Sequence, residues 1–246
     1  MIVLATLFSL LLGFLKASSV QTNALLLDRV TSSPAFITQD QWYSAYNASL
    51  PFLATPLTNL TDHFTYLKNH TYADFMNYAV TIGNISSIDE LAQYYAQMLY
   101  QSNGFMLSMD PACYNSTSAN CQALGLNTTV FGVDVNYFGR GYLWIQGQSA
   151  YSSLCRDMFG SDSTLLLYPD ALSSHKSVNF ATSAWYWKTF VAPGRTNFGS
   201  TTAILRPTTC NGSVTNPTAS SVAAWNVYVA VLKVLSPSAT PSSGFC

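Results

Sequence analysis

Apolar residues recur at helical spacing through much of the first half of the chain. Two capping boxes mark where helices begin, because a Thr or Ser is followed three positions later by Gln or Glu. These are Thr38 with Gln41, and Ser87 with Glu90. Together, the spacing and the capping boxes predict helices at 38–46, 57–68, 71–80 and 87–100.

The second half is interrupted by long stretches without periodicity. Gly, Pro, Asn and Ser dominate 102–135, which therefore predicts a loop. Helical spacing returns at 180–189 and 220–235, and 236–245 has the composition of a tail. The sequence contains neither an internal repeat nor an interdomain linker. We therefore expect one mainly helical domain with long loops over 20–246.

The N-terminus carries a short apolar segment. Residues 2–15 are mostly apolar, and Lys16 and three small residues follow them. The segment is shorter than the roughly 20 residues of a membrane span, but it suits the core of a secretory signal peptide. We predict a signal peptide at 1–19 and a secreted, extracellular protein. An uncleaved anchor is the alternative.

Charged residues make up only 9% of the 246 residues, against about 25% in an ordinary soluble protein. Other polar groups must therefore keep the surface hydrated. N-x-S/T sequons are frequent, and glycans on them would supply that hydration. We predict an N-glycosylated protein, with the sequons at Asn47, Asn59, Asn69, Asn84, Asn115, Asn127 and Asn211.

All five cysteines follow the predicted signal peptide, so an oxidising compartment favours pairing. Cys113 and Cys121 would close a short loop, and Cys210 could be reached from Cys246 at the C-terminus. Cys155 is left over. It would be either a buried thiol or an intermolecular bridge.

Several classes of function are disfavoured. The net charge is −1 and basic residues do not cluster, which argues against nucleic acid as a partner. The three histidines lack further ligands at metal-binding spacing, so we expect no metal. Residues 139–144 lack the third glycine of a dinucleotide fingerprint, and 147–151 lack the last glycine of a nucleophile elbow. We expect no cofactor.

Aromatic and amide side chains are interleaved over 136–151. Aromatic rings next to amides suit a sugar, whose C–H face stacks while its hydroxyl groups need fixed donors and acceptors. The same spacing also suits core packing, which we favour from spacing alone. The side chains concerned are Tyr137, Phe138, Tyr142, Trp144, Gln146, Gln148 and Tyr151.

Several motifs together resemble those of the family 19 chitinases. "YFGRGYLWIQGQSAY" at 137–151 is similar to the family's "YYGRGYIQL…YNY" signature. "YPD" at 168–170 with "FATSAWYWKT" at 180–189, and "NFGSTTAILRPTTC" at 197–210, resemble later motifs of the family in the same order. The resemblance runs from about residue 37 to the C-terminus.

This resemblance implies a mainly α-helical, two-lobed, lysozyme-like fold with a sugar-binding cleft. It also implies secreted hydrolysis of β-1,4-N-acetylglucosamine polymers with inversion. The corresponding disulfides are Cys113–Cys121 and Cys210–Cys246. The implied partner is chitin or another glycan that contains N-acetylglucosamine, bound by Tyr137, Arg140, Trp144, Gln146 and Tyr151.

The catalytic positions of the family are changed in this chain. The general acid of the family corresponds to Gln101, which cannot deliver a proton. Asp110 is a candidate for the second carboxylate. The only glutamate is Glu90, which we expect to serve the capping box. Positions that carry polar groups in the family are also altered, namely Trp144, Ala203, Arg206 and Ser221.

Two hypotheses of different class follow. The favoured one is a catalytically inactive chitinase-like glycoprotein, which is either a lectin for N-acetylglucosamine polymers or an extracellular structural protein with protein partners. The other is a weakly active inverting endochitinase that works through Asp110. The loss of the acid favours the first.

Overall fold

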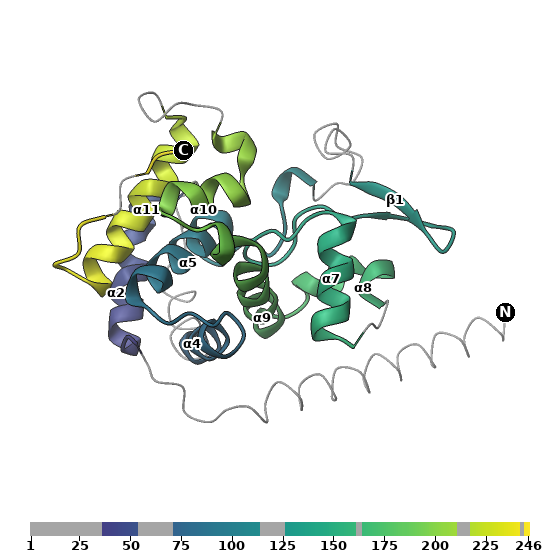
Figure 1. Cartoon of the computed structure of the whole chain (residues 1–246), viewed down its shortest axis with the longest axis horizontal. Coiled ribbons are helices and arrows are strands. Elements are labelled where there is room, and N and C mark those ends of the chain that lie inside the picture. The colour runs from purple at the N-terminus through teal and green to yellow at the C-terminus, as the bar shows by residue number, and fades with distance from the viewer. Residues whose placement is uncertain (1–35, 54–70, 114–125, 161–163, 211–216, 242–243) are drawn as a thin grey trace. The chain divides into compact units, whose positions relative to one another are not determined.

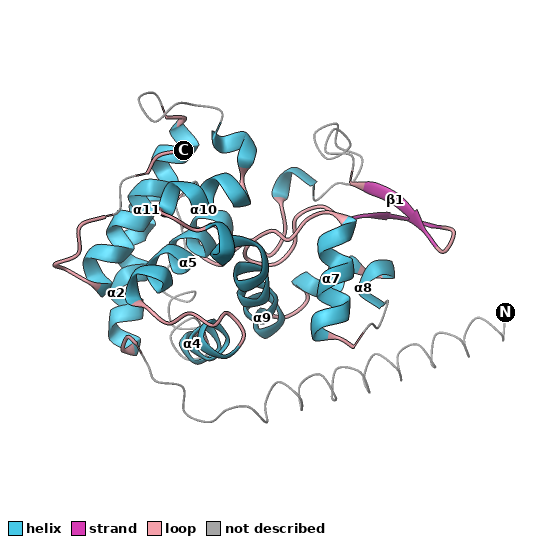
Figure 2. Cartoon of the chain, viewed as in Figure 1, coloured by secondary structure: helices cyan, strands magenta, loops and turns pink. Residues whose placement is uncertain are grey.

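The structure is a computed structural model that describes residues 36–53, 71–113, 126–160, 164–210, 217–241 and 244–246. Residues 35–246 form one compact unit, and the described part is mainly helical (Figures 1 and 2). The longer helices are α2 (Gln39–Ser49), α4 (Tyr72–Thr81), α5 (Ile88–Gln101), α7 (Gln148–Met158), α9 (Lys176–Tyr186), α10 (Phe198–Leu205) and α11 (Ala219–Leu235). Shorter helical segments are η1 (Leu50–Phe52), η2 (Pro111–Cys113), α8 (Thr164–Leu167), η3 (Pro169–Ser173), η4 (Trp187–Val191), η5 (Ala192–Gly194) and η6 (Pro207–Cys210).

The predicted capping signals differ in outcome. At α2, the Thr38 hydroxyl accepts from the Gln41 amide while the Gln41 side chain accepts from the Thr38 amide, which confirms the capping box. At α5, Ser87 Oγ accepts from the Glu90 amide, but the Glu90 carboxylate does not accept from the Ser87 amide. The prediction for Glu90 was therefore wrong, because its carboxylate has other partners, described below.

Helix α5 lies among α2, α4, α10 and α11 (Figure 1). Almost all of its residues are buried, and α11 and α10 pack against it. Helix α11 also packs against α2, and α4 packs against α9. Buried aromatic rings pack around α5, and they include those of Trp42, Tyr46, Phe75, Tyr94, Tyr95, Phe105, Phe180 and Trp187.

A second cluster of buried residues lies under the β-hairpin. Strands β1 (Asn127–Val130) and β2 (Val133–Asn136) pair antiparallel, and α7, α8 and η3 enclose the cluster with them. Tyr137, Tyr151, Leu154 and Trp185 are among its members. The expectation of a mainly helical fold is thus confirmed.

Some predicted boundaries were wrong. The stretch 102–135, predicted to be a loop, contains β1 and most of β2. Helix α9 begins before residue 180 and continues as the π-helical η4. Helices α7 and α10 were not predicted. The predicted helix at 57–68 and the predicted signal peptide lie outside the described residues.

The cysteines follow the expected scheme where the structure describes them. Cys210 and Cys246 form a disulfide, and Cys113 is disulfide-bonded, while Cys121 lies outside the described residues. Cys155 is a buried thiol in the second cluster. Within the described ranges, no helix is long and apolar enough to cross a membrane.

Candidate functional site

Helix α5 ends at Gln101 in a turn with unusual backbone geometry. Asn103, Gly104 and Phe105 all have positive φ angles, of 48°, 70° and 66°. Such values are uncommon for a residue other than glycine and mark strain for a bulky side chain such as Phe105. The surrounding structure must therefore hold this turn in place.

The aromatic core supplies that hold. The ring of Phe105 packs against those of Phe180 and Tyr142, with centroids 5.3 and 5.0 Å away. Tyr46 Oη donates to the Gly104 carbonyl at 3.2 Å, and a Cβ atom at Gly104 would come within 2.9 Å of Tyr46 Oη. Only glycine therefore fits at 104. The end of α5, including Gln101, is held in a fixed position.

Gln101 itself is buried, with 2% of its surface exposed. It lies one turn after Gln97, whose Nε2 donates to the hydroxyl groups of Thr201 and Thr202 at 2.9 and 2.8 Å. Residues i and i+4 share a helix face, so Gln101 faces the C-terminal part of α10. Gln101 Nε2 has no hydrogen-bond partner among the described residues.

Arg206 follows α10 and lies beside this end of α5. Its guanidinium carbon is 4.8 Å from the ring centroid of Tyr100 and 4.6 Å from that of Trp144. Burial lowers the pKa of Arg206 below its usual value, whereas the charges of Tyr100 and Asp110 act to raise it. Arginine nevertheless stays charged at ordinary pH. In the sequence, Arg206 stands out only as a departure from the family's motif and as a lone arginine after an apolar helix in a charge-poor chain.

Trp144 is half-buried and takes a left-handed conformation with φ of 49°. This is an outlier for a large aromatic residue, and such outliers cluster at ligand sites. Its indole Nε1 is buried and has no acceptor among the described residues. Trp144 therefore contributes both a ring and a donor to the region around Arg206.

Asp110, the candidate second carboxylate, is half-buried. Its Oδ1 accepts from the Ala112 amide at 2.9 Å, and its own amide donates to the Gly139 carbonyl. The charge of Asp110 reaches Arg206, as the pKa of the guanidinium shows, but the two groups do not form an ion pair. Asp110 thus lies near the same region as Gln101.

The predicted sugar-binding residues separate into two groups. Tyr137 and Tyr151 are fully buried, and their hydroxyl groups donate to the carbonyls of Leu166 and Phe138. They pack in the second core cluster, so their rings cannot stack on a ligand in this structure. Trp144 and Gln146 reach the surface.

Arg140 was also predicted to bind sugar, but contacts within the protein hold its side chain. Its Nε pairs with Asp170 at 2.8 Å, and its Nη1 donates to the carbonyl of Asn136 at 2.9 Å and to Tyr151 Oη at 3.2 Å. The Arg140 side chain is 4% exposed. Its contacts join β2, the 137–151 segment and η3, and they leave it little contact with solvent.

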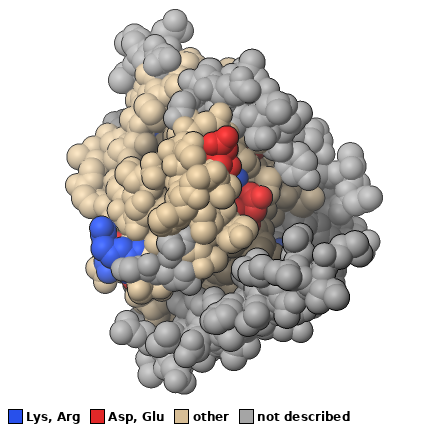
Figure 3. Space-filling model, turned by 90° about the vertical axis from the view of Figure 1, so that its right-hand side faces the viewer, with Lys and Arg blue, Asp and Glu red and all other residues tan. Residues whose placement is uncertain are grey.

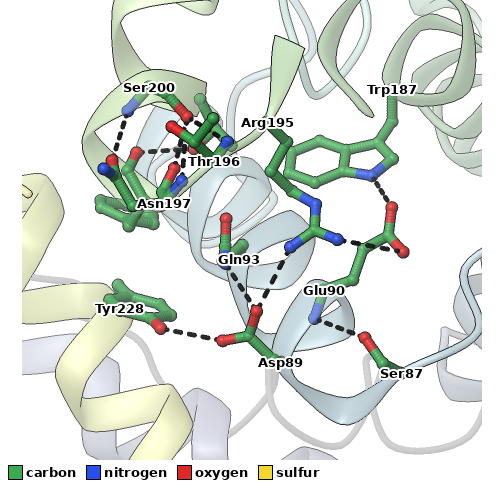
Figure 4. Close-up of polar contacts among 12 residues, drawn as sticks. Ser87, Asp89, Glu90, Gln93, Trp187, Arg195, Thr196, Asn197, Ser200 and Tyr228 are labelled. Atoms are coloured by element: carbon green, nitrogen blue, oxygen red, sulfur yellow. Dashed lines mark hydrogen bonds and ion pairs between the residues drawn. The ribbon is translucent and has the colours of Figure 1, made fainter. Parts of the chain in front are cut away.

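Asp89 and Glu90 lie at the opposite end of α5, within a hydrogen-bonded network (Figure 4). Glu90 Oε1 accepts from Trp187 Nε1 at 3.0 Å, and Oε2 lies 3.8 Å from Arg195 Nη2. Asp89 accepts from Tyr228 Oη at 3.2 Å and from Arg195 Nη1 at 3.3 Å. The only glutamate of the chain thus ties α5 to η4 and to the segment before α10.

An open groove of about 920 Å³ lies between the β-hairpin and η3. It is lined by Met109, Asn127, Thr128, Thr129, Asp134, Val135, Asn136, Phe138, Arg140, Leu167, Pro169 and Asp170. Neither Gln101 nor Arg206 lines it. Figure 3 shows the face of the molecule on this side, where few of the described residues are charged.

Ser221, one of the positions that differ from the family's motifs, lies near the start of α11. It is 3% exposed, and its Oγ lies 3.7 Å from the Sγ of Cys246.

The described residues contain no group of three or more side chains that could hold a metal ion.

Three solved structures of chitinases are similar to this chain in fold. A family 19, class IV chitinase from Zea mays matches with a TM-score of 0.57 at 21% identity, covering 85% of this chain and 95% of that chain. A chitinase C mutant with glutamate replaced by glutamine matches with a TM-score of 0.56 at 17% identity, covering 88% and 81%. A bacterial family 19 chitinase matches with a TM-score of 0.52 at 18% identity, covering 85% and 97%.

No protein-family model matches the sequence, and no curated protein matches it. The likeness therefore lies in the three-dimensional structure. The chain has the fold of the family 19 chitinases, as the motifs predicted.

Proposed function

We propose that this chain is an extracellular chitinase-like glycoprotein that binds β-1,4-linked N-acetylglucosamine chains and does not hydrolyse them. The observation that carries the proposal is Gln101, a buried amide at the end of α5 in the position where the motifs expect a general acid. Inverting hydrolysis requires one carboxylic acid to protonate the leaving oxygen and a second carboxylate to activate water. An amide cannot perform the first step.

The other carboxylates near α5 do not replace the missing acid. Glu90 lies eleven residues earlier on the same helix, roughly 16 Å away by helix rise, and it accepts from Trp187. Asp110 is closer, but one of its oxygens accepts from the Ala112 amide. Loss of a general acid typically costs about 10²–10⁴-fold in rate.

Weak hydrolysis through Asp110 is the second candidate function. The observation that favours it is the position of Asp110, which is half-buried and close enough for its charge to act on Arg206. In that case, Asp110 would activate the attacking water, and the leaving oxygen would take its proton from solvent.

Sugar binding is supported by the half-buried ring of Trp144 and by Gln146, both at the surface. Secretion and glycosylation are supported by the low content of charged residues and by the sequons. The three sequon asparagines that the structure describes, Asn47, Asn84 and Asn127, are exposed. A structural role with extracellular protein partners fits the same scaffold, and loss of sugar binding would favour it.

The experiment that tests the proposal measures product release from chitin oligomers by the purified protein, with Gln101→Ala as the matched control. We expect the wild type to release no more product than the control, while oligomer binding is detected by calorimetry. Turnover by the wild type that is abolished in Asp110→Asn would instead establish the hydrolase. Absence of both turnover and binding would favour the structural role.

A further inference from the structure

The region around the end of α5 contains donors and few acceptors. Gln101 Nε2, Trp144 Nε1 and Arg206 Nε are all buried atoms without a hydrogen-bond partner among the described residues. Buried polar groups are normally paired, and an unpaired donor calls for a ligand or water. They belong to Arg206, to Trp144, whose ring it contacts, and to Gln101, which follows Tyr100, the other ring that it contacts.

The charge of Arg206 is also unbalanced. Within the described ranges, Arg140, Arg156 and Arg195 each form an ion pair with a carboxylate, and Arg206 does not. The rings of Tyr100 and Trp144 hold its guanidinium in place, but they do not neutralise it. Asp110 is the one carboxylate whose charge acts on Arg206, and it lies beyond ion-pair distance.

We propose that this site, made by Gln101, Trp144 and Arg206, binds a carboxylate carried by a sugar of a β-1,4-linked aminosugar chain. A carboxylate offers the acceptors that the three donors lack, and the planar guanidinium matches its geometry. The inference rests on the proposed function, because it names the kind of chain that the proposed binding site prefers.

The same arrangement disfavours the opposite charge. A de-N-acetylated sugar carries an ammonium group, which would meet the guanidinium of Arg206 in a partly desolvated place. A neutral oligomer would leave Arg206 without a counter-charge. The order of affinity is therefore carboxylated, then neutral, then cationic.

The test compares three oligomers of one length: a chitin oligomer, the same oligomer oxidised to carboxylate at C6, and its partly de-N-acetylated form. Calorimetric titration should show the carboxylated oligomer binding about tenfold tighter than the neutral one, as a charge-assisted hydrogen bond provides. The preference should shrink at high salt.

Two variants move the preference in opposite directions. Arg206→Gln should remove the preference for the carboxylated oligomer, so that the ratio of the affinities for the carboxylated and the neutral oligomer falls to about one. Asp110→Asn should strengthen the preference, because it removes the nearby negative charge. Arg156→Gln, an exposed arginine in α7, is the control matched in net charge and should change nothing. If Arg206→Gln does not fold, Arg206→Lys keeps the charge without the fork and should lower the preference partly.

The outcomes separate the two proposals. Binding of the neutral oligomer with no gain from the carboxylate would overturn this inference alone, as would a preference that persists in Arg206→Gln. Failure of the wild type to bind any of the three oligomers would overturn the proposed function and the inference with it.

Discussion

At its N-terminal end, α5 presents Asp89 and Glu90 to Trp187, Arg195 and Tyr228, and both carboxylates have partners (Figure 4). At its C-terminal end, the same helix presents Gln101, whose Nε2 has no partner among the described residues. The first end is built as structure, since both of its carboxylates accept from side chains of other elements, although Gln93 Oε1 and Arg195 Nε there have no partner among the described residues. The second end leaves donors for something else to satisfy.

The network at the first end links α5 to η4, to α11 and to the segment before α10, so losing one member would leave the others unpaired. Gln101 Nε2 at the second end takes no part in such a network among the described residues. We infer that the first end serves folding, whereas the second end can serve binding.

The largest expected effect is a loss of stability at alkaline pH. Both ends of α5 depend on tyrosines buried in the core, so ionisation of these tyrosines would disrupt both. Burial raises the pKa of Tyr94, Tyr95 and Tyr46 above the usual 10.0. In the unfolded chain they ionise near pH 10, so their contribution is complete below that pH and is lost as the pH rises above it. Stability should fall by about 1.4 kcal/mol per pH unit for each tyrosine.

Urea unfolding at a series of pH values checks this prediction, with tyrosinate absorbance followed in the same samples. Ionisation should accompany unfolding. Titration of these tyrosines at their usual pKa in a protein that remains folded would show that their burial is not maintained.

The next effect compares the two ends directly. Glu90→Ala should destabilise the protein by about 3 kcal/mol, because the Trp187 indole loses its acceptor and Arg195 loses one of its two carboxylates. Gln101→Ala should cost about 1 kcal/mol, since Gln101 Nε2 has no hydrogen bond to lose among the described residues. Chemical unfolding of both variants measures the difference, and equal losses would contradict the distinction between the ends.

The contacts at the N-terminal end of α5 were not predicted from the sequence. Ser87 and Glu90 fit a capping box, but Glu90 bonds to Trp187, a residue 97 positions away that no local pattern connects to it. The hairpin was missed because β1 and β2 are short and carry exposed polar residues such as Asp134. The long buried stripe of α5, in contrast, was predicted well from spacing alone.

Around the second end, the motifs predicted the fold and brought attention to Gln101 and Trp144. They could not tell which aromatic residues of 137–151 are core, because burial depends on the packing of α7 and the hairpin. Tyr137 and Tyr151 lie in that packing, whereas Trp144 is turned outward by its left-handed backbone. The contact of Arg206 with Tyr100 and Trp144 likewise depends on the tertiary structure.

A smaller effect is expected at the ring of Trp144, near the C-terminal end of α5. Trp144→Ala should weaken binding of a short chitin oligomer by about 1–2 kcal/mol, within an overall affinity that is roughly millimolar to micromolar. Stability should change little, because the side chain is only half-buried. Calorimetric titration with a parallel thermal unfolding curve checks both. A collapse in thermal stability would mean that Trp144 belongs to the core.

The smallest effect is on catalysis. Gln101→Glu should recover little hydrolytic activity, because the new carboxylate would meet a changed environment at Ala203, Arg206 and Ser221. A product-release assay on chitin oligomers checks this, with Gln101→Ala as the baseline. Robust activity in the single variant would show that the remaining catalytic apparatus is intact.

The C-terminal end of α5 is the proposed ligand-binding site, and a crystal structure of the protein with a chitin oligomer bound tests this most directly. We expect the oligomer to contact Trp144 and to lie beside Gln101 and Arg206. An oligomer seated instead in the groove between the β-hairpin and η3, with Trp144 and Arg206 untouched, would contradict it.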